Sequence, residues 1–242
     1  GFLHVPANDL SAIHALGDAL ANVVAVLVEP IQGEGGIRPL DLDYLQGLRD
    51  LCSQNQWLLM FDEVQTGNGR CGSTYVCEQL EIEPDVLLTA KGLGNGLPIG
   101  VCMARGEAAQ LLGPGDHGST YGGNPLCCAA AIAVLTTLFE DNVMQRATTV
   151  RDALLSALHQ QLSDPGLITE VRGRGLMIGI QPSVATKEVV QRGLDRGLLI
   201  NIAGGDTIRV LPPLVMTDEQ AGELGAGIAN IINDIAEQEN AL

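Results

Sequence analysis

A short apolar strand that ends on two acids limits what this chain can fold into more than any other feature. Residues 58–67 read LLMFDEVQTG, so four apolar residues lead directly to Asp62 and Glu63. This pattern is typical of a buried parallel strand, whose carboxyl end lies where open α/β folds bind ligands. Residues 84–96, PDVLLTAKGLGNG, repeat the design with Lys91 at the end of a second strand. We therefore expect an acid and an amine at one edge of one sheet.

Helices and strands are expected to alternate along the first part of the chain. Apolar positions recur at helical spacing after Asp9 and again after Asp41, and both acids are suitable N-caps. Apolar strands follow these helices at 23–28 and 58–61. The alternation is the βαβ order of a parallel sheet, so residues 1–140 are predicted to form an α/β domain.

The pattern changes after Asp141, where the segments become shorter and more varied. Helices are predicted over residues 143–158, 187–196 and 218–237, and strands over 176–180, 198–200 and 207–211. Residues 141–242 are therefore predicted to form a smaller α+β domain.

Composition narrows the class of ligand. The chain carries 13 Lys and Arg against 29 Asp and Glu, a formal net charge of −16, which argues against nucleic acid and anionic membranes as partners. No apolar run approaches the length that spans a bilayer. We expect a cytoplasmic protein that binds small molecules and no metal, with reduced thiols, because the cysteines lack metal-site spacing. They are Cys52, Cys71, Cys77, Cys102, Cys127 and Cys128.

Two glycine-rich or polar loops are candidates for ligand contact. Residues 32–36, QGEGG, place Glu34 among glycines that let a backbone approach a ligand. The segment taken alone is equally typical of a solvated turn. Residues 117–125 carry Ser119 and Thr120 ahead of an Ala-rich helix, an arrangement that suits a phosphate.

Lysine occurs at only two positions of this sequence. Lys187 lies on an amphipathic helix and is most simply a solvated surface residue. Lys91 follows a buried strand, so either a structural ion pair or a reactive amine fits its context. The nearby Asp62 favours the reactive amine, because Schiff-base chemistry on pyridoxal phosphate needs a lysine for the aldehyde and a carboxylate for the ring nitrogen.

Neighbouring residues supply most of the other groups that this cofactor needs. Val64 is placed to lie on the ring face, Gln65 to reach the phenolic oxygen, and Ser119 or Thr120 to hold the phosphate. Once a substrate amine replaces Lys91, the freed lysine can move a proton from the substrate to the cofactor. That reaction is transamination.

Four motifs in order, at residues 29–36, 62–67, 89–100 and 117–125, resemble those of the class III pyridoxal-phosphate aminotransferases, and most closely the acetylornithine branch. The resemblance implies fold type I. Residues 1–140 would be the C-terminal portion of the large cofactor-binding domain, with an incomplete, mainly parallel sheet covered by helices on both faces. Residues 141–242 would be the small α+β domain.

The resemblance also implies a role for each motif residue. Lys91 and Asp62 would be catalytic, and Thr120 would bind the cofactor phosphate of a neighbouring subunit, so that a homodimer shares its active sites. The implied cofactor-binding residues are Asp62, Glu63, Val64, Gln65, Lys91 and Thr120, and the implied substrate-binding residues are Glu34, Ser119 and Arg209.

Glu34 and Arg209 are implied to let one site accept two substrates. Arg209 would receive the α-carboxylate of glutamate or 2-oxoglutarate, and Glu34 would neutralise it when the other substrate is bound, because an unpaired buried arginine is costly. A permanent Glu34–Arg209 salt bridge is the alternative.

The implied reaction exchanges the terminal amine of N-acetylornithine, or of N-succinyl-diaminopimelate, with 2-oxoglutarate. Ornithine, succinylornithine and 4-aminobutyrate transaminases share most of the motifs. Residues 1–9 resemble a segment inside the large domain, so we expect a missing N-terminal part that would carry the main phosphate loop, the aromatic residue that stacks on the ring and an arginine for the distal carboxylate. A remnant that serves only as a structural or partner-binding subunit is the rival hypothesis.

Overall fold

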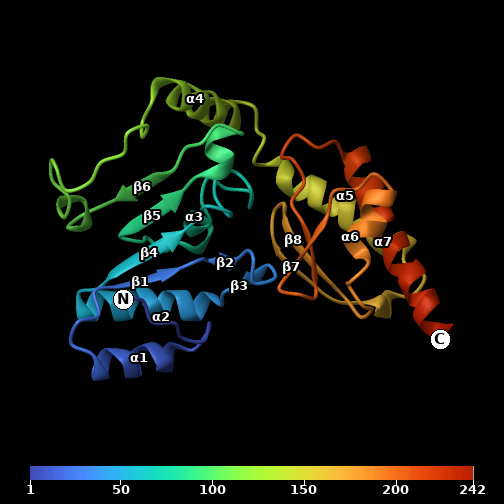
Figure 1. The fold of residues 1–242 in the computed structure, drawn as a ribbon, viewed down its shortest axis with the longest axis horizontal. Coiled ribbons are helices and arrows are strands. Elements are labelled where there is room, and N and C mark those ends of the chain that lie inside the picture. The colour runs from blue at the N-terminus through green and yellow to red at the C-terminus, as the bar shows by residue number, and fades with distance from the viewer. Residues whose placement is uncertain (242) are drawn as a thin grey trace. The chain divides into compact units, whose positions relative to one another are not determined.

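The computed structural model describes residues 1–241, which form two compact units (Figure 1). The first unit comprises residues 1–30, 40–68 and 75–137, and the second comprises 31–39, 69–74 and the chain from residue 138 onward. The predicted boundary between residues 140 and 141 assigned both short segments, 31–39 and 69–74, to the first part. In the structure they pack with the C-terminal part.

A four-stranded sheet organises the first unit. Its strands are β1 (Ala25–Val28), β4 (Leu58–Asp62), β5 (Val86–Thr89) and β6 (Val101–Ala104), in the order β1-β4-β5-β6. The first three strands are parallel and β6 is antiparallel to β5, so the predicted mainly parallel sheet is confirmed. Along β4, Leu59 and Phe61 are fully buried, whereas Leu58, Met60 and Asp62 are only partly covered.

The first unit also contains helices. They are α1 (Leu10–Ala19), α2 (Leu42–Asn55), α3 (Val76–Leu80) and α4 (Pro125–Glu140), together with short 3₁₀ turns at Lys91–Gly94 and Ala108–Gln110. Asp9 caps α1, as predicted, by accepting a hydrogen bond from the Ala12 amide at 3.0 Å. Helix α2 packs on β1 and β4 through a face that buries Leu45 and Leu48 completely, and α1 packs on α2 (Figure 1).

The second unit contains an antiparallel sheet. Its strands are β7 (Ile168–Arg174), β8 (Met177–Pro182), β9 (Asn201–Ala203) and β10 (Thr207–Val210), in the order β7-β8-β10-β9, and a separate hairpin pairs β2 (Ile31–Gln32) with β3 (Arg38–Pro39). Strand β7 was not predicted, because its sequence ITEVRGR has no apolar run. The strand predicted at 198–200 was placed too early. Pairing with β10 begins at Asn201, and Leu198 instead donates its amide to the Gly193 carbonyl at the end of the preceding helix.

Three helices complete the second unit, with a 3₁₀ turn at Pro165–Leu167. They are α5 (Arg146–Gln161), α6 (Val189–Asp195) and α7 (Asp218–Asn240). Thr217 and Gln220 form a capping box at the start of α7. The core lies between α5, α7 and the sheet, where Leu154, Leu158 and Ile178 are fully buried.

Helices α5 and α7 approach closely at Gly225. A Cβ atom at this position would lie 2.1 Å from the Leu154 carbonyl oxygen, whereas a Cβ at Gly222, one turn earlier, would meet nothing within 4 Å. We expect Gly225→Ala to destabilise the protein by about 2–3 kcal/mol, because backbone atoms would have to separate. The matched Gly222→Ala is expected to stabilise it by about 0.5–1 kcal/mol through helix propensity. Urea unfolding of both variants tests this; shifts of equal sign would contradict the close crossing.

Three further features of the described residues concern membrane-spanning helices, metal-ligand side chains and cysteines. None of the helices in residues 1–241 has the length and hydropathy needed to cross a membrane, and this part of the chain contains no cluster of metal-ligand side chains. All six cysteines are free. Burial raises the pKa of Cys52 to about 11, and burial together with the Glu63 charge raises that of Cys77 to about 12, so both thiols stay protonated at neutral pH.

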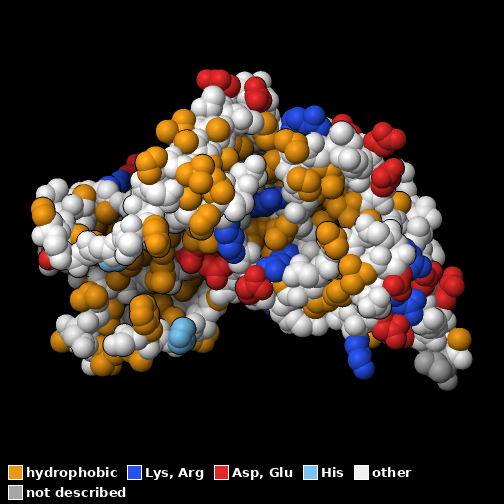
Figure 2. Space-filling model, turned by 45° about the horizontal axis from the view of Figure 1, so that its top comes forward, with side chains coloured by type: hydrophobic (Ala, Val, Ile, Leu, Met, Phe, Trp, Pro, Cys, Tyr) orange, Lys and Arg blue, Asp and Glu red, His pale blue; other side chains and the backbone are white. Residues whose placement is uncertain are grey.

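Charged side chains of both signs meet on the surface near the C-terminal end of α7 (Figure 2). Arg196 pairs there with Asp234, and Arg192 pairs with Glu188 one helical turn away. These are exposed ion pairs, whose contribution to stability is small.

Candidate active site

Asp62 is the last residue of β4, the strand that lies between β1 and β5. The register pairs Asp62 with Leu88 of β5, three residues before Lys91, so the acid and the lysine follow neighbouring parallel strands at the same edge. The Asp62 side chain is half-buried, and its Oδ1 atom accepts a hydrogen bond from the Val64 amide at 3.0 Å. This bond fixes the carboxylate relative to the loop that follows the strand.

Glu63 is fully buried, and its carboxylate binds other residues of this chain. Its carboxylate accepts hydrogen bonds from the Thr66 hydroxyl and from the Val76 and Cys77 amides at the start of α3, at 2.7–2.9 Å. Burial raises the pKa of Glu63, and the hydrogen bonds partly offset that effect. The sequence placed Glu63 among cofactor-binding residues. From these contacts we infer instead that it positions the loop after β4.

Lys91 begins a 3₁₀ turn directly after β5. Its backbone is left-handed, with φ of +45°, and its side chain is exposed. Within residues 1–241 it forms no ion pair. Of the two interpretations that the sequence left open for Lys91, the described part of the chain therefore offers no carboxylate partner for the structural one.

Asn68 ties the loop after β4 to the end of β5. Its Nδ2 atom donates to the Thr89 hydroxyl at 2.8 Å and to the Ala90 carbonyl at 3.1 Å, immediately before Lys91. Asn68 is 4% exposed and has φ of +56°, a conformation that asparagine tolerates better than most residues. Sequence reasoning missed this contact; an asparagine between two glycines was its only signal.

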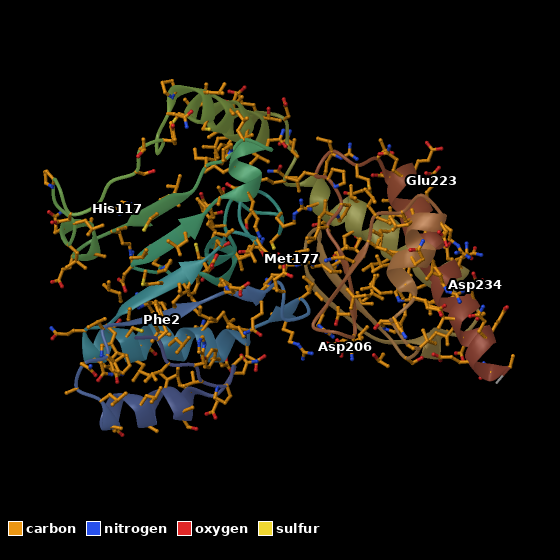
Figure 3. All side chains as sticks on the ribbon, viewed as in Figure 1. Phe2, His117, Met177, Asp206, Glu223 and Asp234 are labelled. Carbon is orange, nitrogen blue, oxygen red and sulfur yellow. The ribbon has the colours of Figure 1, made fainter. Side chains whose placement is uncertain are left out.

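The remaining predicted site residues of the first unit lie in two loops. Val64 and Gln65 are half-buried in the segment between β4 and α3. Ser119 and Thr120 lie in the exposed loop between β6 and α4 that also carries His117 (Figure 3). The Ser119 hydroxyl oxygen accepts a hydrogen bond from the Gly122 amide at 3.0 Å, a contact within the loop. The structure thus brings Asp62 and Lys91 to one sheet edge and leaves the hydroxyls on a separate loop.

The amine and the carboxylate of the first unit fit two of the groups that pyridoxal phosphate needs. The cofactor needs an amine for its aldehyde, a carboxylate for its ring nitrogen and donors for its phosphate. The amine of Lys91 has no structural ion pair among the described residues, and the Asp62 carboxylate follows the neighbouring strand. The Ser119 loop, which precedes α4, carries hydroxyls that can donate to a phosphate. At the start of α4, the Cys127 amide already donates to Asn124 Oδ1 at 3.0 Å.

A second group of predicted residues lies in the second unit. Arg209 is in β10, and its Nη1 atom pairs with Glu34 Oε1 at 2.5 Å. The Arg209 side chain is 11% exposed and that of Glu34 is 75% exposed. Arg209 also donates from Nε to Asn201 of β9 at 3.2 Å, so the strand pairing and this bond fix the guanidinium while the carboxylate reaches in from outside.

The sequence matches the family described as Aminotransferase class-III over residues 5–232. It is 44% identical over 239 residues to acetylornithine aminotransferase 1 of Bordetella pertussis, a match that covers 99% of this chain and 61% of the relative. It is 47% identical over 229 residues to acetylornithine aminotransferase of Gloeobacter violaceus, covering 92% and 56%. The chain thus spans about three fifths of the length of the curated relatives it matches.

Solved structures give the same result. The ornithine aminotransferase of Toxoplasma gondii matches with a TM-score of 0.90 at 36% identity, over 98% of this chain and 57% of that one. The N-acetylornithine aminotransferase of Stenotrophomonas maltophilia matches with a TM-score of 0.87 at 33% identity, over 100% and 64%. The sheet, the placement of the motifs and these similarities agree, and the chain belongs to the class-III aminotransferase family.

Proposed function

We propose that the protein containing this chain transfers the terminal amino group of N-acetylornithine to 2-oxoglutarate, with pyridoxal phosphate as cofactor. The curated relatives named above are acetylornithine aminotransferases. Pyridoxal phosphate is the cofactor of this family, and a related Toxoplasma ornithine aminotransferase was crystallised with partial occupancy of PLP. The observation that carries the proposal is the Glu34–Arg209 pair, in which a largely buried arginine meets an exposed carboxylate.

The first unit supplies the reacting groups. Pyridoxal phosphate offers an aldehyde to the substrate amine and a ring that withdraws electrons from the adjacent carbon. Lys91 Nζ would be the amine that holds the cofactor, and the same amine would move a proton from the substrate carbon that bears the reacting amine to the cofactor. The Asp62 carboxylate would keep a proton on the ring nitrogen. Its own geometry is fixed by the Val64 amide.

The second unit supplies the carboxylate site. Arg209 offers a planar fork that binds the α-carboxylate of glutamate in two parallel hydrogen bonds. N-acetylornithine reacts through its terminal amine, so its carboxylate is not at that position and Arg209 would be left unpaired. Glu34 neutralises Arg209 in that case and leaves when glutamate binds. The high exposure of Glu34 supports this exchange, because little packing holds its carboxylate in place.

Glu34→Gln is expected to raise kcat/KM for glutamate relative to N-acetylornithine by about tenfold, because loss of one charge-assisted hydrogen bond to an exposed carboxylate is worth roughly 1.5 kcal/mol, the lower end of the usual range. The glutamine no longer neutralises Arg209, so the half-reaction with N-acetylornithine becomes slower and the half-reaction with glutamate becomes faster. Single-turnover rates of both half-reactions measure the ratio. Glu188→Gln is the matched control, since Glu188 is an exposed partner of Arg192 in the same unit. An unchanged ratio would mean that the salt bridge is permanent.

The identity of the amino donor is tested by comparing substrates. Full-length protein should transaminate N-acetylornithine with 2-oxoglutarate faster than ornithine, succinylornithine, N-succinyl-diaminopimelate or 4-aminobutyrate. The similarity to ornithine aminotransferase structures makes ornithine the second candidate. Preference for ornithine would move the protein to that branch. If the holoprotein turns over none of these donors, the rival hypothesis of a structural or partner-binding subunit stands.

We further propose that the protein is a homodimer with shared active sites. Helix α4 and the loop before it expose large apolar side chains, with Tyr121 82%, Leu126 68% and Ile132 65% exposed. Such patches on soluble proteins mark interaction sites. Because the same loop carries Thr120, a second copy that covers it would place this hydroxyl near another subunit. Light scattering tests the assembly, and a monomer under assay conditions would contradict it.

A further inference from the structure

The loop that carries Glu34 has a strained backbone. Gly36 has φ of +107°, and the next residue, Ile37, has φ of +51° although it is β-branched and fully buried. A branched residue in the left-handed region is unfavourable and persists only where its surroundings impose it. Within the loop, the Gly36 and Ile37 amides donate to the Gly33 carbonyl, at 3.2 and 3.3 Å. These local bonds are long, so the strained conformation needs further support.

Arg172 of β7 provides that support. Its Nε atom donates to the carbonyl oxygens of Gly36 and Ile37, at 2.9 and 3.0 Å, on both sides of the strained residue. The Arg172 side chain is 8% exposed. Within the loop, Arg38 Nε also donates to the Gly35 carbonyl at 2.9 Å. The Arg172 bonds are charge-assisted and join two further carbonyls of the loop to β7.

The same guanidinium also reaches the strand that carries Arg209. Arg172 Nη2 donates to the Thr207 hydroxyl at 2.6 Å, two residues before Arg209 in β10. Its Nη1 atom donates to Glu170 and Gln181, each at 2.6 Å. Asp206, labelled in Figure 3, accepts hydrogen bonds from Thr207 and Gln181 and completes the network. The five hydrogen bonds that Arg172 donates within residues 1–241 therefore go either to the Glu34 loop or to the sheet.

Close packing of the loop on the sheet depends on two glycines. A Cβ at Gly179 of β8 would lie 2.8 Å from Ile37 Cβ, and one at Gly204 would lie 2.7 Å from the Gly35 carbonyl oxygen. The Gly204 amide donates to the Glu34 carbonyl at 3.0 Å. The loop is thus seated directly on β8 and on the turn between β9 and β10.

We propose that Arg172 is a positioning residue that sets the separation between Glu34 and Arg209 and thereby the preference between a substrate with a carboxylate at Arg209 and one without. The inference rests on the proposed function. One side of the Arg172 fork holds the backbone that presents Glu34, and the other holds the strand of Arg209. Without the Arg172 guanidinium, the strained loop relaxes and Glu34 moves away from Arg209. Arg209 itself stays in place, because β8, β9 and Asn201 hold it.

Arg172→Lys in the full-length holoprotein tests the proposal. Lysine keeps the charge but has no planar fork, so it cannot bind both carbonyls and Thr207 together. We expect kcat/KM for glutamate relative to N-acetylornithine to rise by roughly 3- to 10-fold, in the direction of Glu34→Gln. Combined with Glu34→Gln, Arg172→Lys should change that ratio less than twofold further, since both act through the same carboxylate. Addition of the two effects would overturn the proposal.

Two measurements without turnover accompany the kinetics. Hydrogen exchange of the peptide over residues 31–39 should become faster in Arg172→Lys, and glutarate, a dicarboxylate without an amine, should bind tighter in calorimetry by roughly 3- to 10-fold. Arg192→Lys, at a surface ion pair, is the matched control and should change neither. Unchanged glutarate affinity with normal exchange over 31–39 would show that Arg172 serves the fold alone.

A second variant keeps the test valid if Arg172→Lys does not fold. Thr207→Val preserves the shape of a fully buried side chain and removes its bond to Arg172. It should shift the substrate ratio in the same direction by a smaller factor, and no shift would overturn the proposal. The proposed function fails separately, if wild-type protein neither transaminates any donor nor binds glutarate. In that event, hydrogen exchange still decides whether Arg172 holds the loop.

Discussion

Lys91→Ala is expected to abolish covalent attachment of pyridoxal phosphate and to lower kcat/KM for N-acetylornithine by at least about 10³-fold, because in the proposed function one side chain would act as both nucleophile and proton carrier. The position supports this expectation. Lys91 is exposed, follows β5 and has no ion-pair partner among residues 1–241 that would compete for the amine.

The attachment itself can be measured without an activity assay. Borohydride reduction of the full-length holoprotein should leave a stable adduct, and peptide mass spectrometry should find it on Lys91. Lys187→Ala is the matched control, because Lys187 is the only other lysine of this sequence and lies just before α6. An adduct on Lys187, or an unchanged adduct yield in Lys91→Ala, would contradict the assignment.

Asp62→Asn is expected to lower kcat by about 10²- to 10³-fold with little change in folding, because a preorganised charge next to developing charge has an effect of this size. Asparagine retains an oxygen that can accept the Val64 amide, so the loop after β4 keeps its anchor. Only the negative charge, which in the proposed function would hold the proton on the ring nitrogen, disappears.

Stopped-flow absorbance of each half-reaction measures this effect, together with thermal unfolding. Asp50→Asn, an exposed change on α2, is the control for a generic loss of one negative charge. If Asp62→Asn keeps wild-type rates, the carboxylate does not serve the ring nitrogen. If it instead unfolds the protein, the role of Asp62 is structural, and Asp62→Glu then separates charge from position.

The elements that the sequence predicted well are those with a local signal. Helix α1 begins at the predicted Asp9 cap, and β4 and β5 end close to the acid and the lysine, because caps and apolar runs act over a few residues. Strand β7 was missed because its polar residues owe their place to pairing with β8. Strand β9 begins at Asn201, where pairing with β10 begins, and the apolar run before it does not pair.

In the candidate site, too, some contacts could be predicted from the sequence and others could not. Asp62 and Lys91 could be paired from the sequence, since parallel strands deliver their ends to one edge. The contacts of Asn68, Glu63 and Arg172 could not, because they join residues 21, 13 and 136 positions apart in the chain.

The sequence by itself determined the family, the sheet edge and the residues proposed for the chemistry, because these depend on motifs and on short-range periodicity. Only the tertiary structure decided that residues 31–39 and 69–74 pack with the C-terminal part, and that one buried guanidinium clamps the Glu34 loop to the sheet of Arg209. The physical reason is that a buried polar group must find its hydrogen-bond partners wherever the fold places them, and those partners have no fixed spacing in sequence.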